Sequence, residues 1–145
     1  MKKLLPLCLA AVPLLLLLAM IARYGVDMPF ADEWELVPLV DVSFRGEARF
    51  HDFWTQQNEH RIFFPKLLLV SLARFTSWNI LCEIYLMVAL AAGILFFVCK
   101  IILRARPALT DTAFAWLLPV LSAAAFSLRQ WENWLMGVNI VIYVS

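Results

Sequence analysis

Residues 4–22 form a run of nineteen residues without a charge, LLPLCLAAVPLLLLLAMIA, directly after Lys2 and Lys3. At about 1.5 Å of rise per residue, a helix over this run extends about 28 Å, close to the thickness of the hydrocarbon core of a bilayer. A segment this apolar must be shielded from water, and it constrains the fold more than any other feature of the chain. We therefore expect a transmembrane helix here.

A secretory signal peptide also begins with a basic stretch followed by an apolar run. Its apolar core is normally shorter, however, and Ala19 to Ala22 is a poor cleavage site. Further apolar runs follow downstream, which also favours a helix that is retained. Cleavage of the segment as a signal peptide stays open as the alternative.

The composition extends this conclusion to the whole chain. Apolar residues make up 63% of it and charged residues 16%, whereas soluble domains usually have about 45–50% and about 25%. The excess of apolar residues excludes a soluble globular domain, and it also excludes a disordered chain. A net charge of +1 provides no basic surface for nucleic acid, so we expect none as a partner.

Two more apolar runs are long enough to span a membrane. The second helix is expected at about 80–103, since Lys100 near its end can extend its charge to the interface. The third is expected at 112–128, with a kink at Pro119. Residues 137–145 begin a fourth apolar run that is too short to span as a helix. The chain is therefore expected to be the N-terminal part of a longer membrane protein, inactive by itself.

Positive charges orient membrane helices because Lys and Arg are retained on the cytoplasmic side. Lys2 and Lys3 precede the first helix, and basic residues also surround the end of the second. Placing both groups in the cytoplasm puts residues 23–79 outside and 104–111 inside. We expect an integral protein of the bacterial inner (plasma) membrane, with the first loop facing the periplasm or exterior.

The long outer loop contains three stretches with helical spacing of apolar residues, at 32–40, 50–59 and 62–75. The first suits a short helix lying in the interface, and the third is short for a span and suits an interfacial or re-entrant helix. Alternatively, residues 62–78 form a full span, which would place Arg104 outside and is disfavoured by the charge rule. The predicted fold class is an all-α membrane protein with about three complete transmembrane helices, a truncated fourth and interfacial helices in the loop.

Adjacent acids follow the first helix closely, at Asp32 and Glu33. Like charges at a membrane surface raise one another's pKa, which suits a general base or a ligand for a divalent cation. Both residues are therefore candidate catalytic residues, and a metal is a possible cofactor there. The alternative for Asp32 is that it caps the helix that follows.

Two further polar clusters are candidate substrate-binding sites. In the first, Arg61 can bind a phosphate with two parallel hydrogen bonds, His60 can donate to it or transfer a proton, and Glu59 lies beside them. The alternative is a solvated junction with local salt bridges. In the second, Glu132 lies among tryptophans on the same outer face, where interfacial anchoring is the alternative.

These clusters together resemble the GT-C superfamily of integral membrane glycosyltransferases, in particular bacterial multi-spanning members. The resemblance rests on four stretches in this order: Asp32-Glu33-Trp34, Asn58-Glu59-His60-Arg61, Phe64-Pro65-Lys66 and Gln130-Trp131-Glu132-Asn133 before Gly137. It implies a polyprenyl-phosphate-linked sugar as donor and chemistry on the non-cytoplasmic face. It also implies that an acid in the first outer loop acts on the acceptor hydroxyl or holds a metal or the acceptor, and the matching residue is Asp32.

From these residues we expect a glycosyltransferase whose partners are membrane lipid and a polyprenyl-phosphate sugar. Asp32, Glu33, Glu59, His60, Arg61 and Glu132 are expected to converge on one cavity at the outer membrane surface. The main alternative is a non-enzymatic transport or assembly subunit of envelope biogenesis. Transport is disfavoured because Glu83 and Lys100 are the only charged candidates within the expected spans, and both lie near helix ends.

Overall fold

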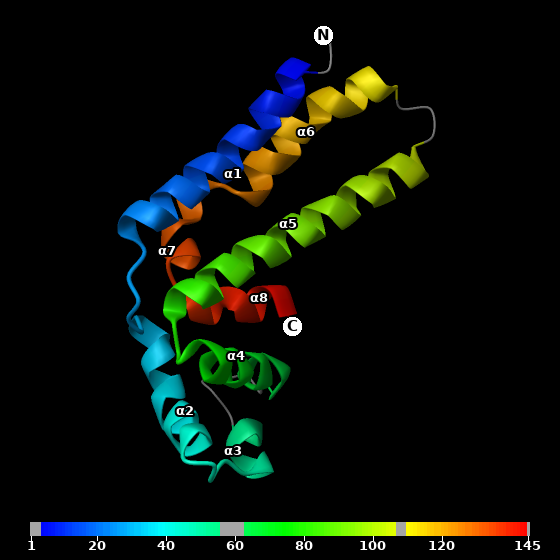
Figure 1. Ribbon diagram of the computed structural model, residues 1–145. Coiled ribbons are helices and arrows are strands. Elements are labelled where there is room, and N and C mark those ends of the chain that lie inside the picture. Colours follow the sequence, from blue (N-terminus) through cyan, green and yellow to red (C-terminus); the bar gives the residue numbers. More distant parts are fainter. Residues whose placement is uncertain (1–3, 56–62, 107–109, 145) are drawn as a thin grey trace. The chain divides into compact units, whose positions relative to one another are not determined.

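A computed structural model describes residues 4–55, 63–106 and 110–144, and within these ranges every regular element is a helix (Figure 1). The expected all-α class is therefore confirmed. The elements in chain order, with η marking 3₁₀ helices, are α1 (Leu4–Tyr24), η1 (Ala31–Leu36), α2 (Val37–Phe44), α3 (Phe50–Trp54), α4 (Phe63–Thr76), α5 (Ile80–Ala105), α6 (Asp111–Ala125), η2 (Leu128–Gln130), α7 (Trp131–Trp134), η3 (Gly137–Ile140) and α8 (Val141–Val144).

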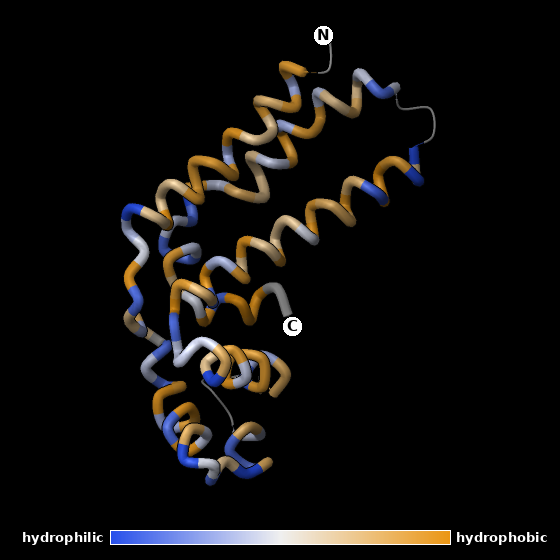
Figure 2. Tube along the Cα trace, in the orientation of Figure 1, coloured by the Kyte–Doolittle hydropathy of each residue, from blue (hydrophilic) through white to orange (hydrophobic). Residues whose placement is uncertain are grey.

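Three helical segments are long and apolar enough to cross a membrane: Leu4–Tyr24, Ile80–Ala105 and Asp111–Trp134. Figure 2 shows hydrophobic residues along most of α1 and α5. The third segment is the least apolar, and it is not one continuous α-helix, because α6 ends at Ala125 and η2 and α7 follow. Three such segments are compatible with an integral membrane protein.

The chain divides into two compact units, which we describe separately. The first consists of Met1–Gly25 with Val88–Trp131, and the second of Val26–Met87 with Glu132–Ser145. The first two turns of α5 thus belong to the second unit and the remainder of this helix belongs to the first. All three candidate spans have most of their length in the first unit.

In the first unit, α1 and α6 lie side by side and run in the same direction, while α5 runs in the opposite direction (Figure 1). This is the alternation that three successive spans require. The hydroxyl of Ser122 donates to the Ala10 carbonyl at 2.6 Å, which links α6 to α1. The α6 helix runs through Pro119, whose missing N–H leaves the Ala115 carbonyl without its usual partner in the helix.

Most of the large exposed side chains of α1 are leucines. Each of the following side chains is at least 42% exposed: Leu4, Leu5, Leu7, Leu9, Val12, Leu15 and Leu16. A soluble monomer rarely exposes a contiguous apolar surface of this extent, because hydrating it is unfavourable. Hydrocarbon or further apolar helices would cover this surface without that cost.

In the second unit, α4 is in contact with α2, α3 and α8. Its buried residues recur at intervals of three and four, which is the spacing of one helix face: Pro65, Lys66, Leu69, Val70 and Ala73. The opposite face exposes Phe64 and Leu67. Fourteen residues extend only about 21 Å as a helix, less than the hydrocarbon core of a bilayer.

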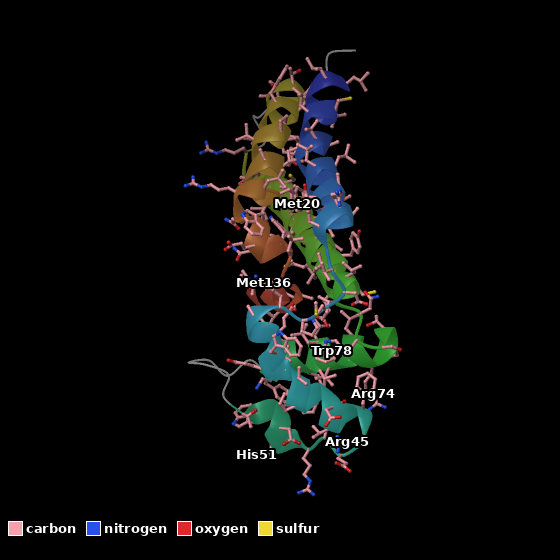
Figure 3. All side chains as sticks on the ribbon, turned by 90° about the vertical axis from the view of Figure 1, so that its left-hand side faces the viewer. Met20, Arg45, His51, Arg74, Trp78 and Met136 are labelled. Carbon is pink, nitrogen blue, oxygen red and sulfur yellow. The ribbon has the colours of Figure 1, made fainter. Side chains whose placement is uncertain are left out.

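The short helices between α1 and α5 begin close to the stretches that the sequence indicates. Where a helix was expected at 32–40, the chain forms η1 and then α2, and α3 starts the stretch at 50–59. Pairs among the rings of Phe50, Phe53, Trp54 and Phe63 have centroids 5.4–6.4 Å apart, so aromatic contacts hold α3 against α4. The guanidinium of Arg74, labelled in Figure 3, donates to the Ser43 carbonyl and joins α4 to α2.

The junction between α4 and α5 is a tight turn. Ser77 and Trp78 have φ of 57° and 59°, and the Trp78 N–H donates to the Ala73 carbonyl at 2.6 Å, which ends α4. The Asn79 side chain accepts from the Cys82 N–H at 3.1 Å and thereby caps α5. The carboxylate of Asp27 accepts from the Ile80 N–H at 2.7 Å. These bonds satisfy N–H groups in the first turn of α5, which also carries Glu83.

Candidate functional site

Glu33 closes the turn that follows the first candidate span. Its carboxylate oxygen Oε2 accepts from the Phe30 N–H at 2.7 Å, while its own N–H donates to the Phe30 carbonyl at 3.1 Å. Between the two residues, Ala31 has a φ of 48°, in the left-handed region that an alanine rarely occupies. The reciprocal bonds hold the backbone in this conformation, so Glu33 determines the path of the chain through Asp32.

The same carboxylate also binds a segment that lies 105 residues further along the chain. Its other oxygen, Oε1, accepts from the Val138 N–H at 2.8 Å, in a buried bond. This bond joins η1 to η3 inside the second unit. Both oxygens of Glu33 therefore accept backbone hydrogen bonds, and its side chain is only 1% exposed. A carboxylate held in this way is suited to fixing two segments together.

Gly137 lies at the point where two carboxylates meet. A Cβ atom at this position would be 2.8 Å from Glu83 Oε2 and 3.0 Å from Glu33 Oε1. Because both oxygens lie so close to one point, the carboxylates of Glu33 and Glu83 face each other across the glycine. The absence of a side chain at residue 137 is what allows this approach.

Glu83 is 2% exposed, and no described residue donates a hydrogen bond to its carboxylate. The negative charges of Glu33 and Asp27 both act on it. Burying like charges together is unfavourable unless a proton or a cation compensates for them. Among the described residues, no group of three or more His, Cys, Asp or Glu side chains is arranged to hold a metal ion. We call Asp27, Glu33, Glu83 and Gly137 the acid cluster.

Burial raises the pKa of Glu33 above its ordinary value of 4.5, and the N–H groups of Phe30, Val138 and Gly137 oppose this shift only in part. A carboxyl group whose pKa is raised by folding stabilises the fold fully below its unfolded pKa. This stabilisation is lost as the pH rises through the folded pKa. The free energy of unfolding should therefore decrease as the pH rises above about 4.5.

The test is to compare the protein with its Glu33→Gln variant in detergent, from about pH 4 to about pH 8. We expect the free energy of unfolding of the unchanged protein to decrease more steeply with pH than that of the variant. Equal slopes for the two proteins would show that Glu33 does not titrate differently on folding.

The predicted site residues lie in different elements, and some of them are outside the part of the chain that the structure describes. Asp32 is the second residue of η1, and its side chain is outside the described part. The residue at the N-cap position is Phe30, so the hypothesis that Asp32 caps this helix is wrong, and Glu33 provides the capping bond instead. Glu59, His60 and Arg61 lie outside the described residues. Glu132 is in the first turn of α7 and is exposed.

Sequence reasoning did not identify three members of the acid cluster as site residues. From the sequence, Glu83 is a charged candidate for transport near the end of an expected span, and Gly137 begins the apolar run after the last stretch that carries the resemblance. Asp27 is one of several acids in residues 23–79. A signal was present for Glu83, because an acid in the first turn of a strongly apolar helix is often buried and functional. No local pattern indicates that Glu33 and Glu83 meet at Gly137, because this contact depends on tertiary structure.

Comparison of the chain with protein-family models, with curated proteins and with solved structures found no match.

Proposed function

We propose that the protein is a GT-C-like membrane glycosyltransferase that uses a polyprenyl-phosphate-linked sugar on the non-cytoplasmic face. The observation that supports this most is the hydrogen bond from the Val138 N–H to Glu33. It connects the Glu33 side chain of the Asp32-Glu33-Trp34 stretch to η3, which begins at Gly137, shortly after the Gln130–Asn133 stretch. A side chain of one stretch that carries the resemblance thus contacts the backbone just beyond another, far apart in the sequence.

The contacts of Glu33 suggest how the adjacent acids divide their roles. Both oxygens of Glu33 accept from backbone N–H groups, so we assign Glu33 as a positioning residue that fixes the turn. Asp32 is then the acid that acts on the acceptor hydroxyl. The acceptor oxygen bonds to the anomeric carbon, the bond from that carbon to the phosphate oxygen breaks with its electron pair leaving on the phosphate, and the hydroxyl proton passes to Asp32.

The donor requires a site for its phosphate at the depth of the lipid headgroups. We assign Arg61 to that phosphate, with Glu59, His60 and Glu132 as further substrate-binding residues. The exposed apolar face of α4, with Phe64 and Leu67, supports a helix lying at the membrane surface, where such a donor is accessible. We place this face on the periplasmic or exterior side of a bacterial inner membrane.

Topology can be tested with single cysteines at Glu47 and Ala108, in a background where Cys8, Cys82 and Cys99 are replaced by serine. Residues 23–79 are proposed to be outside and 104–111 inside, because of the distribution of Lys and Arg. In intact cells, a membrane-impermeant maleimide should label position 47 and not position 108. Labelling of position 108 in intact cells would contradict this topology.

Replacing Arg61 should weaken donor binding. Arg61→Ala removes the charged hydrogen bonds to the phosphate, each worth about 1.5–3 kcal/mol, so donor affinity should decrease by roughly tenfold or more. Arg61→Lys should recover only part of it, because lysine cannot form the bidentate contact. The measurement is the dissociation constant of a polyprenyl-phosphate sugar in nanodiscs. If Arg61→Ala binds the donor with unchanged affinity, the assignment of Arg61 to the donor phosphate is wrong, and residues 58–61 are a simple polar junction.

The proposed reaction can be tested without knowing the sugar acceptor. The protein expressed from its complete reading frame would be reconstituted with cell-envelope extract and a set of polyprenyl-phosphate hexoses. Release of polyprenyl phosphate reports transfer whichever sugar is moved. We expect release with at least one donor and its loss in Asp32→Asn, whereas no release with any donor would contradict the proposal.

A second function, proton or cation transport, is favoured by one observation. The acid cluster buries Glu33 and Glu83 together at the start of a candidate span, where ionisable residues often mark an ion pathway. For a transporter, Glu83→Gln should abolish ion flux into proteoliposomes while Asp32→Asn should leave it unchanged. For the transferase, Asp32→Asn is the variant that should lose activity.

A further inference from the structure

A second polar site lies in the same unit as the acid cluster, between η1, α2, α3 and α4. It is a cavity of about 240 Å³. One wall is apolar and is formed by Leu36, Pro38, Leu39 and Val42. The other wall carries the polar groups of Glu35, Asp52, Thr55 and Lys66. The roles proposed so far for the acid cluster and for Asp32 do not involve this cavity.

Lys66 provides a donor that is held in place. Its side chain is 5% exposed, and its ammonium group donates to the Thr55 carbonyl at 2.8 Å and to the Thr55 hydroxyl at 3.2 Å. An ammonium group has three N–H donors, so two are used here. No described acceptor meets the third. A buried donor of this kind favours a ligand that carries an oxygen acceptor.

The acceptors of the cavity are two carboxylates. One oxygen of Asp52 accepts from the Arg49 N–H at 2.7 Å and caps α3, which leaves its other oxygen for a ligand. Glu35 is exposed, and its charge acts on Lys66. The polar wall therefore has one positive and two negative groups. A phosphate or another anion placed there would be repelled by Glu35 and Asp52.

We propose that this cavity binds one sugar ring, as a monosaccharide subsite of the glycosyltransferase. Sugar hydroxyls donate to Glu35 and Asp52 and accept from Lys66, while the C–H face of the ring lies on Leu36, Leu39 and Val42. The volume is below the roughly 300–1,000 Å³ of sites for drug-sized ligands, which fits a single ring better than a whole lipid-linked donor. This assignment rests on the proposed function.

The test measures binding of methyl hexopyranosides, by saturation-transfer NMR, to the protein in lipid nanodiscs, because maltoside detergents would themselves provide sugar. Glu35→Gln removes an acceptor charge, and Val42→Phe fills the cavity without removing a polar group. Each should weaken binding of the bound glycoside by about tenfold or more. The matched control is Asp41→Asn, an exposed acid on α2 that pairs with Arg45 and does not line the cavity.

Three outcomes would overturn the sugar assignment: no glycoside binds, binding is the same in Glu35→Gln and Val42→Phe, or glycerophosphoethanolamine binds in place of the glycosides. The last would identify a site for a zwitterionic lipid headgroup. Failure here is distinguishable from failure of the proposed function. Asp32-dependent release of polyprenyl phosphate without glycoside binding in the cavity refutes only the subsite, and glycoside binding without release refutes only the transferase.

Discussion

Asp32→Asn is expected to reduce kcat for glycosyl transfer by about 10²–10⁴-fold, the usual contribution of a positioned general base. Asparagine has nearly the shape of aspartate, but it cannot take the proton from the acceptor hydroxyl. Donor affinity should change little, because the donor phosphate is assigned to Arg61. The measurement is steady-state release of polyprenyl phosphate, together with the dissociation constant of the donor.

The position of Asp32 makes this variant informative. The turn is closed by the backbone and side chain of Glu33, and the N-cap position is occupied by Phe30. Asp32→Asn should therefore leave the path of η1 intact. Asp41→Asn is the matched control, because it removes an exposed carboxylate whose pair with Arg45 is a surface salt bridge. Near-normal turnover of Asp32→Asn would show that Asp32 is not the base.

Gly137→Ala is expected to destabilise the protein by about 1–3 kcal/mol, the usual cost of overpacking a buried site. The added Cβ would lie 2.8 Å from Glu83 Oε2 and 3.0 Å from the Cβ of Glu83. A carboxylate oxygen at the end of a flexible side chain can move, but the Cβ atom of a helical residue cannot move without the backbone. Unfolding in detergent would measure the loss.

Gly93→Ala is the control for the substitution itself. Gly93 lies within α5, and a Cβ added there meets nothing within 4 Å. Since alanine favours a helix over glycine by about 1 kcal/mol, this variant should be slightly more stable.

Adding Glu83→Ala to Gly137→Ala should restore part of the lost stability, because the oxygen that collides with the new Cβ is removed. A Gly137→Ala protein as stable as the original would contradict the close contact.

The sequence by itself was sufficient for the class of fold and for the long helices. An uncharged run of about 20 residues has few ways to satisfy its backbone away from water, and a helix does so within the run. The same reasoning located the beginnings of α1 and α5, where basic or polar residues meet the apolar run. These features are local, so composition and spacing are enough to predict them.

The short helices between α1 and α5 were only partly predictable. Helical spacing indicated a single helix from Asp32, but the chain makes a 3₁₀ turn up to Leu36 and starts α2 at Val37. The reason is Glu33, whose carboxylate is held by the N–H groups of Phe30 and Val138. A residue at a distant position therefore helps to decide the local conformation, which a periodic pattern cannot show.

Tertiary structure alone decided the acid cluster and the cavity at Lys66. Glu33 and Glu83 are 50 residues apart in the sequence, and they meet because Gly137 leaves room between them. The sequence presents Lys66 as part of the Phe64-Pro65-Lys66 stretch of the resemblance, and no local pattern predicts that Thr55 holds its ammonium group inside the unit. The sequence determined which segments are apolar enough to be helices in a membrane. Which polar groups these helices bury together depends on contacts between distant segments, because the cost of burying a charge is set by its neighbours.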